Sequence, residues 1–192
     1  MTTYSGQDWG GRTVEGERFT DCTFTGCDLS EISTVGATFE QCRFVDVRLN
    51  SSQHDGTGFI GCRFEGTSFF DARLTGCKLV GSHFTRCTLA PLTVRGGNWS
   101  FVTMRGADLR RVELVDVSLV EADLTEADLS GATVTGCDLS RADLRAVRLV
   151  DTDLRGSALH GIDPTAPRWA GARLDLAAAV TLTEALGAVI EL

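Results

Sequence analysis

The stretch Ala122-Asp123-Leu124-Thr125-Glu126-Ala127-Asp128-Leu129-Ser130-Gly131 decides the fold. It contains two five-residue units, each with a small residue, Asp, Leu, a hydroxyl residue and a polar residue or Gly. The same five-residue grid continues from Val14 to Leu174 without a slip. A period of five fits neither the 3.6-residue period of an α-helix nor the two-residue period of a β-strand. Such a short repeat predicts units that bury their apolar sides only by stacking on their neighbours.

Two positions in each unit are predicted to face inward: the large apolar residue and a small residue two places before it. The large position holds mostly Phe in the first half of the chain and mostly Leu in the second. One large and one small side chain per unit would fill a narrow interior without voids. The other three positions are mostly charged, hydroxylic or Gly, so we expect them to face water.

The repeat resembles that of the pentapeptide-repeat proteins, written small-(Asp/Asn)-(Leu/Phe)-(Ser/Thr/Arg)-Gly. Ala107-Asp108-Leu109-Arg110, Cys137-Asp138-Leu139-Ser140 and Ala142-Asp143-Leu144-Arg145 match its first four positions. The resemblance covers residues 14–174. It implies an all-β fold, a right-handed quadrilateral parallel β-helix with four units per coil. We therefore expect about eight coils, stacked at the strand spacing of roughly 4.8 Å.

The chain is predicted to have three parts. Residues 1–13 are Gly-rich and polar and are interpreted as a lead-in that covers the first coil, and residues 14–174 form the β-helix. Residues 175–192 leave the repeat: Asp175 can N-cap a helix from Leu176 to Leu186 that stops at Gly187. The apolar stretch 188–192 is predicted to be a short strand.

A proline interrupts the middle of the repeat at Ala90-Pro91. Because proline has no backbone N–H, it belongs at a corner or an irregularity of a sheet. We expect a local kink here, with a cis bond as one form of it. The five-residue grid continues across the proline, so no loop is inserted.

The C-terminal segment is predicted to join two copies of the chain. An open coil end exposes unpaired strand edges, which proteins normally cover. A covering helix with an apolar face leaves surface that a second copy can bury about a two-fold axis. The expected homodimer interface consists of Val180, Leu182, Leu186, Val189 and Ile190. A monomeric cap is the alternative.

The charge of the chain excludes several partners. The 192 residues carry a formal net charge of −8, which argues against direct nucleic-acid binding and against an anionic membrane surface. No apolar run approaches the length of a membrane span, and the first residues do not resemble a signal sequence. The sequence therefore predicts a cytoplasmic protein with no membrane partner.

Seven cysteines occupy the small inward position of the repeat: Cys22, Cys27, Cys42, Cys62, Cys77, Cys87 and Cys137. This regularity is typical of small buried apolar residues, and we interpret them as reduced packing residues. Stacked cysteines twenty residues apart would be close enough for a disulfide, but parallel side chains and a reducing cytosol oppose it. No spacing is typical of a zinc site, and we expect neither a metal nor a cofactor.

Thr34 and His54 interrupt the large apolar position on one side of the expected rod. His54 could be a buried switch or a ligand. The alternative is a looser side of the coil, where a polar residue meets water or backbone. His83 and His160 lie off the large position and are predicted to be exposed.

Charge is uneven along the chain. Residues 72–107 contain no Asp or Glu, whereas acids dominate from Asp108 to Asp153. We predict an acidic, partner-binding face made of Asp108, Asp116, Glu121, Asp123, Glu126, Asp128, Asp138 and Asp143. The alternative is that Asp in this repeat position only forms hydrogen bonds at coil corners and keeps the rod soluble.

Catalysis finds little support, because the repeat explains the Ser, Thr, Asp and Cys residues and a filled rod offers no cleft. We therefore predict a protein that is not an enzyme. The resemblance implies a DNA-mimicking rod that binds DNA gyrase, inhibits supercoiling and protects against fluoroquinolones. The alternative is a structural or adaptor repeat protein that presents a flat side to an unrelated partner. Only a DNA mimic should compete with DNA and weaken steeply with salt.

Overall fold

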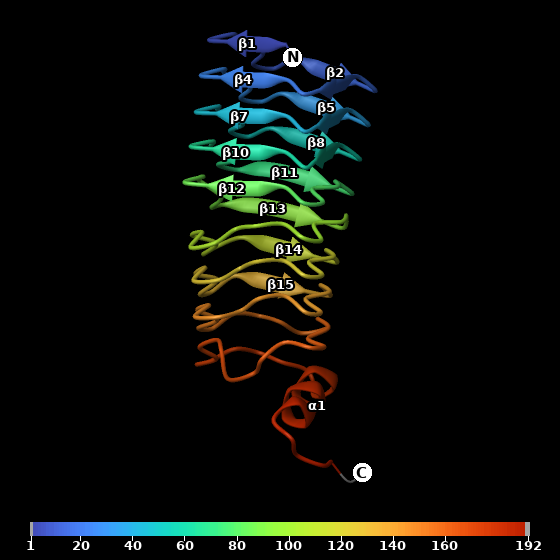
Figure 1. Cartoon of the computed structure of the whole chain (residues 1–192), viewed down its shortest axis with the longest axis vertical. Coiled ribbons are helices and arrows are strands. Elements are labelled where there is room, and N and C mark those ends of the chain that lie inside the picture. Colours follow the sequence, from blue (N-terminus) through green and yellow to red (C-terminus); the bar gives the residue numbers. More distant parts are fainter. Residues whose placement is uncertain (1, 191–192) are drawn as a thin grey trace.

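The protein is a rod of stacked coils, seen in a computed structural model that describes residues 2–190. The N-terminus lies at one end of the rod and the single helix at the other (Figure 1). Strands are short because the chain turns a corner after each five-residue unit. All strand pairings are parallel and join residues twenty apart, as in Thr3↔Thr23 and Glu113↔Thr133. The expected parallel β-helix is thereby confirmed.

The coils have four sides, which we number in chain order. The first side is the sheet of β1 (Thr3–Ser5), β4 (Thr23–Thr25), β7 (Arg43–Val45), β10 (Arg63–Glu65) and β12 (His83–Thr85). The second side is linked by isolated bridges, beginning with Asp8↔Asp28. The third side is the sheet of β2 (Thr13–Glu15), β5 (Ser33–Val35), β8 (Gln53–Asp55), β11 (Ala72–Thr75), β13 (Leu92–Arg95), β14 (Glu113–Val115) and β15 (Thr133–Thr135). The fourth side begins with β3 (Arg18–Thr20), β6 (Thr38–Glu40) and β9 (Gly58–Ile60) and continues by bridges.

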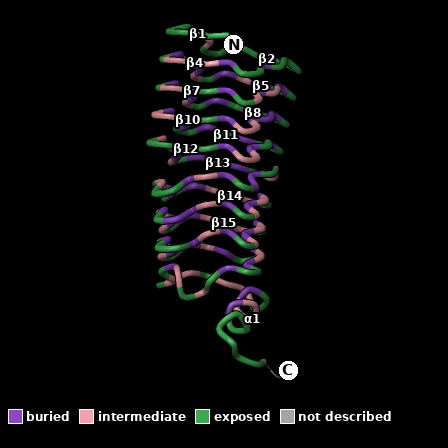
Figure 2. The backbone as a smooth tube through the Cα atoms, viewed as in Figure 1, coloured by how far each residue is buried: buried purple, intermediate pink, exposed green. Residues whose placement is uncertain are grey.

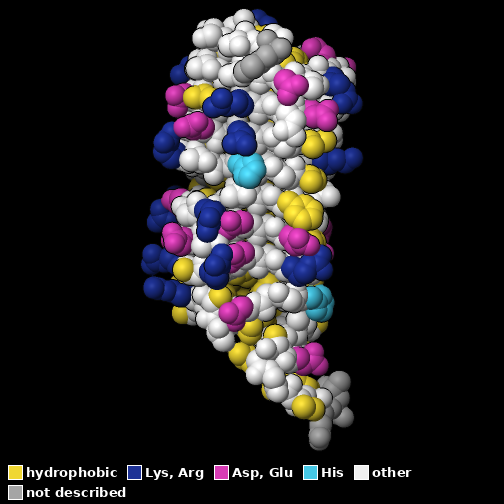
Figure 3. Space-filling view, viewed as in Figure 1, with side chains coloured by type: hydrophobic (Ala, Val, Ile, Leu, Met, Phe, Trp, Pro, Cys, Tyr) yellow, Lys and Arg dark blue, Asp and Glu magenta, His cyan; other side chains and the backbone are white. Residues whose placement is uncertain are grey.

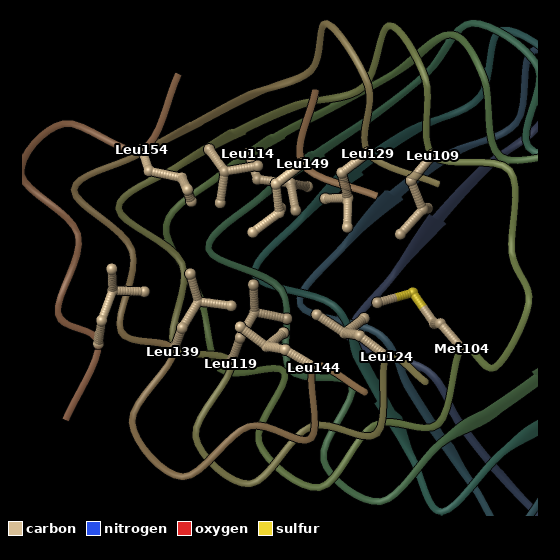
Figure 4. A pocket seen from close by; sticks show the side chains of 12 residues that line it. Met104, Leu109, Leu114, Leu119, Leu124, Leu129, Leu139, Leu144, Leu149 and Leu154 are labelled. Atoms are coloured by element: carbon tan, nitrogen blue, oxygen red, sulfur yellow. The ribbon is translucent and has the colours of Figure 1, made fainter. Parts of the chain in front are cut away.

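The large apolar residues form the core, which runs along the rod as a continuous buried column (Figure 2). In the N-terminal half it consists of aromatic ladders. Phe39 stacks between Phe19 and Phe59, with ring centroids 4.8 and 5.0 Å apart. In the C-terminal half, leucines from facing sides point toward one another and fill the interior (Figure 4). Apolar burial on this scale is the main force that holds the coils together.

The small inward position has a second role besides filling space. Its thiols and hydroxyls donate to a backbone carbonyl 23 residues earlier, as from Cys62 Sγ to Phe39 O at 3.2 Å and from Ser82 Oγ to Phe59 O at 2.7 Å. All seven cysteines are free thiols, and burial raises the pKa of Cys77 to about 11. A protonated, buried thiol is unreactive at neutral pH. These contacts agree with the interpretation of the cysteines as packing residues.

Residues 3–13 belong to the first coil, so the prediction of a separate lead-in over residues 1–13 is wrong. Strand β1 pairs with β4, and the ring of Tyr4 stacks on Phe24 with centroids 4.7 Å apart. Trp9 packs against the same core. Both aromatic residues occupy the large position of the repeat. The polar residues between them make this repeat hard to recognise in the sequence.

The chain is irregular at Ala90-Pro91, where the peptide bond is cis. The amide of Asp71 donates to Pro91 O at 2.8 Å, whereas that of Ser51, one coil earlier, donates to Phe70 O, nineteen residues ahead. The bonding partner is thus shifted by one residue at the proline. Leu92 then pairs with Ala72, so the coil register is restored at once, as predicted.

Helix α1 (Leu176–Ala185) ends the rod. Asp175 is its N-cap and accepts a hydrogen bond from Ala178 N at 2.8 Å, and Gly187 follows with a φ of +87°. The predicted helix is confirmed. The strand predicted for residues 188–192 is wrong for residues 188–190, which extend away from every sheet edge (Figure 1); residues 191–192 lie outside the described part. No helix in residues 2–190 is long and apolar enough to cross a membrane.

Candidate partner-binding surface

The structure distributes the eight predicted acidic residues around the rod and does not gather them on one face. Asp123 and Asp143 lie on the first side, where they pair in register. The others occupy the second side (Asp108 and Asp128), the fourth side (Asp138) and three corners (Asp116, Glu121 and Glu126). The predicted single face is therefore wrong, because residues five apart in sequence point from different sides of a coil. We call these eight residues the acidic belt.

Part of the belt has a local structural role. Asp138 Oδ1 accepts a hydrogen bond from Ser140 N at 2.9 Å, and Asp143 Oδ1 accepts one from Arg145 N at 3.1 Å. The hydrogen bonds from Ser140 hold the pKa of Asp138 below its usual value. The same contact from residue i+2 recurs at Asp108, Asp123 and Asp128. The alternative interpretation of Asp as a residue for local hydrogen bonds thus applies to these five positions.

Arginines neutralise several belt residues. The closest pairs are Asp143–Arg145 at 2.5 Å, Asp108–Arg110 at 2.6 Å, Glu121–Arg141 at 2.9 Å and Asp123–Arg105 at 3.3 Å. These pairs are exposed, so they contribute little to stability, but they reduce the negative field outside the rod. Asp128 and Arg148 are farther apart, at 3.9 Å. Within residues 2–190, no ion pair involves Asp116, Glu126 or Asp138.

Asp116 and Glu126 stand out because they lie at corners and have no local partner among the described residues. Their φ angles of +56° and +64° are in the left-handed region, which turns the chain between two sides. The fifth position of the repeat supplies these corners and is Gly in the family pattern. An acid at the fifth position is therefore the sequence signal that separates outward-facing carboxylates from those bound to the backbone.

The net charge changes sign twice along the rod. Residues 1–71 hold eleven acids and five bases, residues 72–107 hold five bases and no acid, and residues 108–153 again hold eleven acids and five bases. At roughly 4.8 Å per coil, residues 108–153 span about 11 Å, so one net negative charge falls on about 1.8 Å of the rod. B-form DNA carries one charge per about 1.7 Å of its axis. Only this segment reaches that density.

The predicted dimer residues separate into two groups. Leu182 is 9% exposed and packs with Ala178 against the coil core, so it closes the rod of its own chain. Leu186 and Val189 are 61% and 87% exposed. Val180 and Ile190 are half-buried. Residues that face outward at the C-terminal end are thus available to a second copy, but Leu182 is not.

His54 lies inside the rod and meets neither water nor a looser coil side. Its Nδ1 is 2.7 Å from Thr34 Oγ1, and its Nε2 is 3.0 Å from Ser52 Oγ. Burial lowers the pKa of His54 to about 3, so the ring is neutral at physiological pH. The hydroxyls explain how a polar ring is accommodated in the core. His83 and His160 are exposed, as predicted.

The described residues show little that resembles a catalytic centre. No group of three or more His, Cys, Asp or Glu side chains in residues 2–190 is placed to hold a metal ion. The enclosed space inside the rod is lined only by Met104, Val134 and leucines (Figure 4).

Comparisons with known proteins agree with the fold. The sequence pattern of the family "Pentapeptide repeats" matches eight copies in this chain, at residues 55–86 and 122–161. The chain is similar to solved structures of QnrB1, described as a plasmid-mediated fluoroquinolone resistance protein. Two trypsin-treated variants of QnrB1 match at 22% identity with TM-scores of 0.72 and 0.77, over 99% of this chain and 98% of theirs. Full-length QnrB1 matches at 20% identity with a TM-score of 0.52, over 97% of this chain and all of the other. No curated protein matches the sequence.

Proposed function

This chain belongs to the pentapeptide-repeat family, and on that premise we propose that it binds DNA gyrase as a mimic of DNA. In this proposal the rod occupies a DNA-binding surface of the enzyme, inhibits supercoiling and protects gyrase from fluoroquinolones. The observation that carries it is the charge density of residues 108–153, which is close to that of a DNA duplex. A rigid acidic rod complements a surface that evolved to bind phosphates.

The distribution of the acidic belt supports this proposal better than a single face would. A duplex presents phosphates around its whole circumference, and the belt likewise lies on three sides and three corners of the rod. Asp116, Glu126 and Asp138 are the members with no ion pair in the described residues. We propose these three as the strongest contributors to gyrase binding.

Within the family, the chain resembles the mycobacterial fluoroquinolone-resistance protein MfpA, which also has an uninterrupted rod and a C-terminal helix. The QnrB1 proteins with a similar fold are described as fluoroquinolone resistance proteins. Their identity to this chain is low, so they support the fold, and the shared activity is part of the proposal. By the same resemblance we propose a cytoplasmic homodimer joined through the exposed apolar residues Leu186 and Val189.

A second candidate is an adaptor that presents a flat side to a protein partner. The fourth side favours it, since Lys78 is the single charged residue on that side between Glu40 and Asp138. The outward column beside Lys78 includes Ile60 and Val80 and, two coils farther along, Val120; the corner residue Phe101 is 52% exposed. A neutral, partly apolar strip of this kind suits a protein surface better than a phosphate-binding one.

The two candidates are separated by a supercoiling assay with purified gyrase from the same organism. The DNA mimic should inhibit supercoiling, compete with DNA and lose affinity steeply as salt rises. With a fluoroquinolone present it should also reduce the drug-stabilised DNA breaks. Normal supercoiling and unchanged breaks at high protein concentration would exclude the gyrase proposal and leave the adaptor.

A further inference from the structure

The first side of the rod carries an outward column in which charges of one sign are segregated from those of the other. From the N-terminal end the column reads Thr23, Arg43, Arg63, His83, Thr103, Asp123 and Asp143. In the face of the rod that Figure 3 shows, basic and acidic side chains both occur along its length. Although the whole chain is strongly acidic, this column is divided into a basic half and an acidic half, whereas the neighbouring outward column carries Glu65, Arg105 and Arg145.

Each half of the column contains like charges at adjacent positions. Arg43 pairs in register with Arg63, and neither arginine forms an ion pair within residues 2–190. Asp123 pairs in register with Asp143 in the same way. Like charges at the strand spacing repel each other. The basic half of this column therefore lacks anions. The acidic half lies four coils away, where Asp123 and Asp143 also pair with Arg105 and Arg145 of their own chain.

We propose that a second copy of the chain packs antiparallel against the first side, about a two-fold axis at the coil of Thr103. The axis lies in the plane between the two rods and is perpendicular to both. Rotation about it reverses the order of the column, so that the columns of the two copies face each other in opposite directions. It places His83 opposite Asp123 of the other copy and Arg63 opposite Asp143. Both contacts occur twice, because the interface is isologous.

The other charged residues along this side fit the same axis. In the second outward column of the side, Glu65 falls opposite Arg145 of the other copy. At the corner beside it, Arg86 falls opposite Glu126, a belt residue without an ion pair in the described residues. Within one chain Glu65 and Arg86 lie 2.6 Å apart, so these contacts extend an existing ion pair into a network. The sequence of charges on this side is thus complementary to its own reverse, which is the pattern that an isologous contact requires.

The centre of the contact is mostly uncharged. Thr103 lies on the axis. Phe101, which is 52% exposed at the preceding corner, approaches Phe101 of the other copy. Arg105 also faces Arg105 of the other copy. Within each chain, however, Arg105 Nε lies 3.3 Å from Asp123 Oδ2, and this ion pair reduces the repulsion between the two arginines. A flat side with exposed charges predicts a weak, salt-sensitive association. The contact is separate from the C-terminal end, and because it covers Asp123, Glu126 and Asp143 of the acidic belt it would compete with gyrase for that side of the rod.

Charge reversal tests the proposal directly. Arg63→Glu and Asp143→Arg should each weaken association about ten-fold, because each places two pairs of like charges in the interface. The double variant should recover to within about a factor of two of the parent. An equimolar mixture of the two single variants should also associate. Sedimentation equilibrium at about 0.05 M salt measures each dissociation constant, with Leu186→Arg and Val189→Arg present in every variant so that the proposed C-terminal dimer does not contribute.

Recovery in the double variant can arise only between copies. Positions 63 and 143 are four coils apart, about 19 Å, which exceeds the screening length of about 8 Å at physiological salt. Arg73→Glu with Asp153→Arg is the matched control, since it makes the same charge changes on the third side and should leave association unchanged. Circular dichroism confirms that each variant is folded. Folded single variants that associate like the parent, or a folded double variant that does not recover, would overturn the proposal.

Discussion

The Nδ1 atom of His54 lies 2.7 Å from Oγ1 of Thr34, which occupies the equivalent position one coil earlier. Thr34 Oγ1 also lies 2.7 Å from Thr57 Oγ1, and Ser52 Oγ donates to Leu49 O at 2.6 Å. Thr34 and His54 thus interrupt the large apolar position, and hydroxyls of the small position lie within hydrogen-bond distance of them. Burial disfavours the charged form of the imidazole and lowers the pKa of His54, so the folded state should be sensitive to acid.

Acid should therefore destabilise the rod through His54. The unfolded chain takes up a proton near pH 6.5, whereas burial keeps the pKa in the folded protein at about 3. Between these values the unfolded state binds more protons, so the free energy of unfolding falls by about 1.4 kcal/mol per pH unit as the pH drops. Urea titrations at pH 7, 6 and 5 measure the slope, above the range in which carboxylates titrate.

His54→Leu should remove most of that slope, because leucine does not titrate. Leucine should also fit the site, since Leu74 occupies the same column one coil later. His160→Gln is the control, since His160 is exposed and lies outside the proposed contact between copies. An equal slope in the parent and in His54→Leu would mean that other groups cause the acid sensitivity.

The phenylalanine ladder should dominate the stability of the N-terminal half. Phe39 is 1% exposed and stacks on Phe19 and Phe59, so Phe39→Ala should lower the free energy of unfolding by about 3–5 kcal/mol. Phe70 is 50% exposed, and Phe70→Ala should change stability by less than about 0.5 kcal/mol. Chemical denaturation measures both. Similar losses at the two positions would contradict the ladder as the main source of stability.

Gly97 should tolerate no side chain. Its φ is +100°, and a Cβ atom there would lie 2.1 Å from the carbonyl oxygen of Cys77. Gly97→Ala should therefore destabilise the fold by about 2–3 kcal/mol through overpacking and backbone strain. Gly106→Ala is the comparison, since Gly106 also has a positive φ but open space around it. The thermal midpoint should fall distinctly more for Gly97→Ala than for Gly106→Ala. Equal shifts would show that the backbone at Cys77 can move to accommodate the added methyl group.

The outward carboxylates of the acidic belt should control gyrase inhibition. Neutralising the three belt residues without an ion pair in residues 2–190 should raise the concentration for half-inhibition on the order of ten-fold. This variant carries Asp116→Asn, Glu126→Gln and Asp138→Asn. The control makes the same change in charge at the N-terminal end, with Glu17→Gln, Asp21→Asn and Glu31→Gln. An equal loss of gyrase inhibition in both variants would mean that inhibition depends on the net charge of the rod and not on the acidic belt.

The C-terminal end should respond differently at its inner and outer residues. Leu186→Arg and Val189→Arg should weaken the proposed C-terminal dimer without loss of helical signal, because both residues are exposed in one chain. Leu182→Arg should instead destabilise the last coils, since Leu182 packs against the core. Light scattering and circular dichroism separate the two effects. A dimer that persists in Leu186→Arg/Val189→Arg would exclude this interface.

The sequence by itself determined the coil, because the fold depends on local spacing. Residues at the large position must be buried, and a five-residue period permits few ways to bury them. The helix limits followed equally from Asp175 and Gly187, which act on the adjacent backbone. Tyr4 and Trp9 were missed because polar and glycine residues surround them, although they follow the same grid.

Only the tertiary structure decided how the charges are arranged. Asp116 and Asp123 are only seven residues apart in sequence, but one lies at a corner and the other on the first side, beside Arg105. Pairing between charges twenty residues apart depends on the coil length and on side-chain geometry, neither of which a local pattern contains. The sequence therefore predicted an acidic region, and the coil turned it into a belt, because each successive unit points in a new direction.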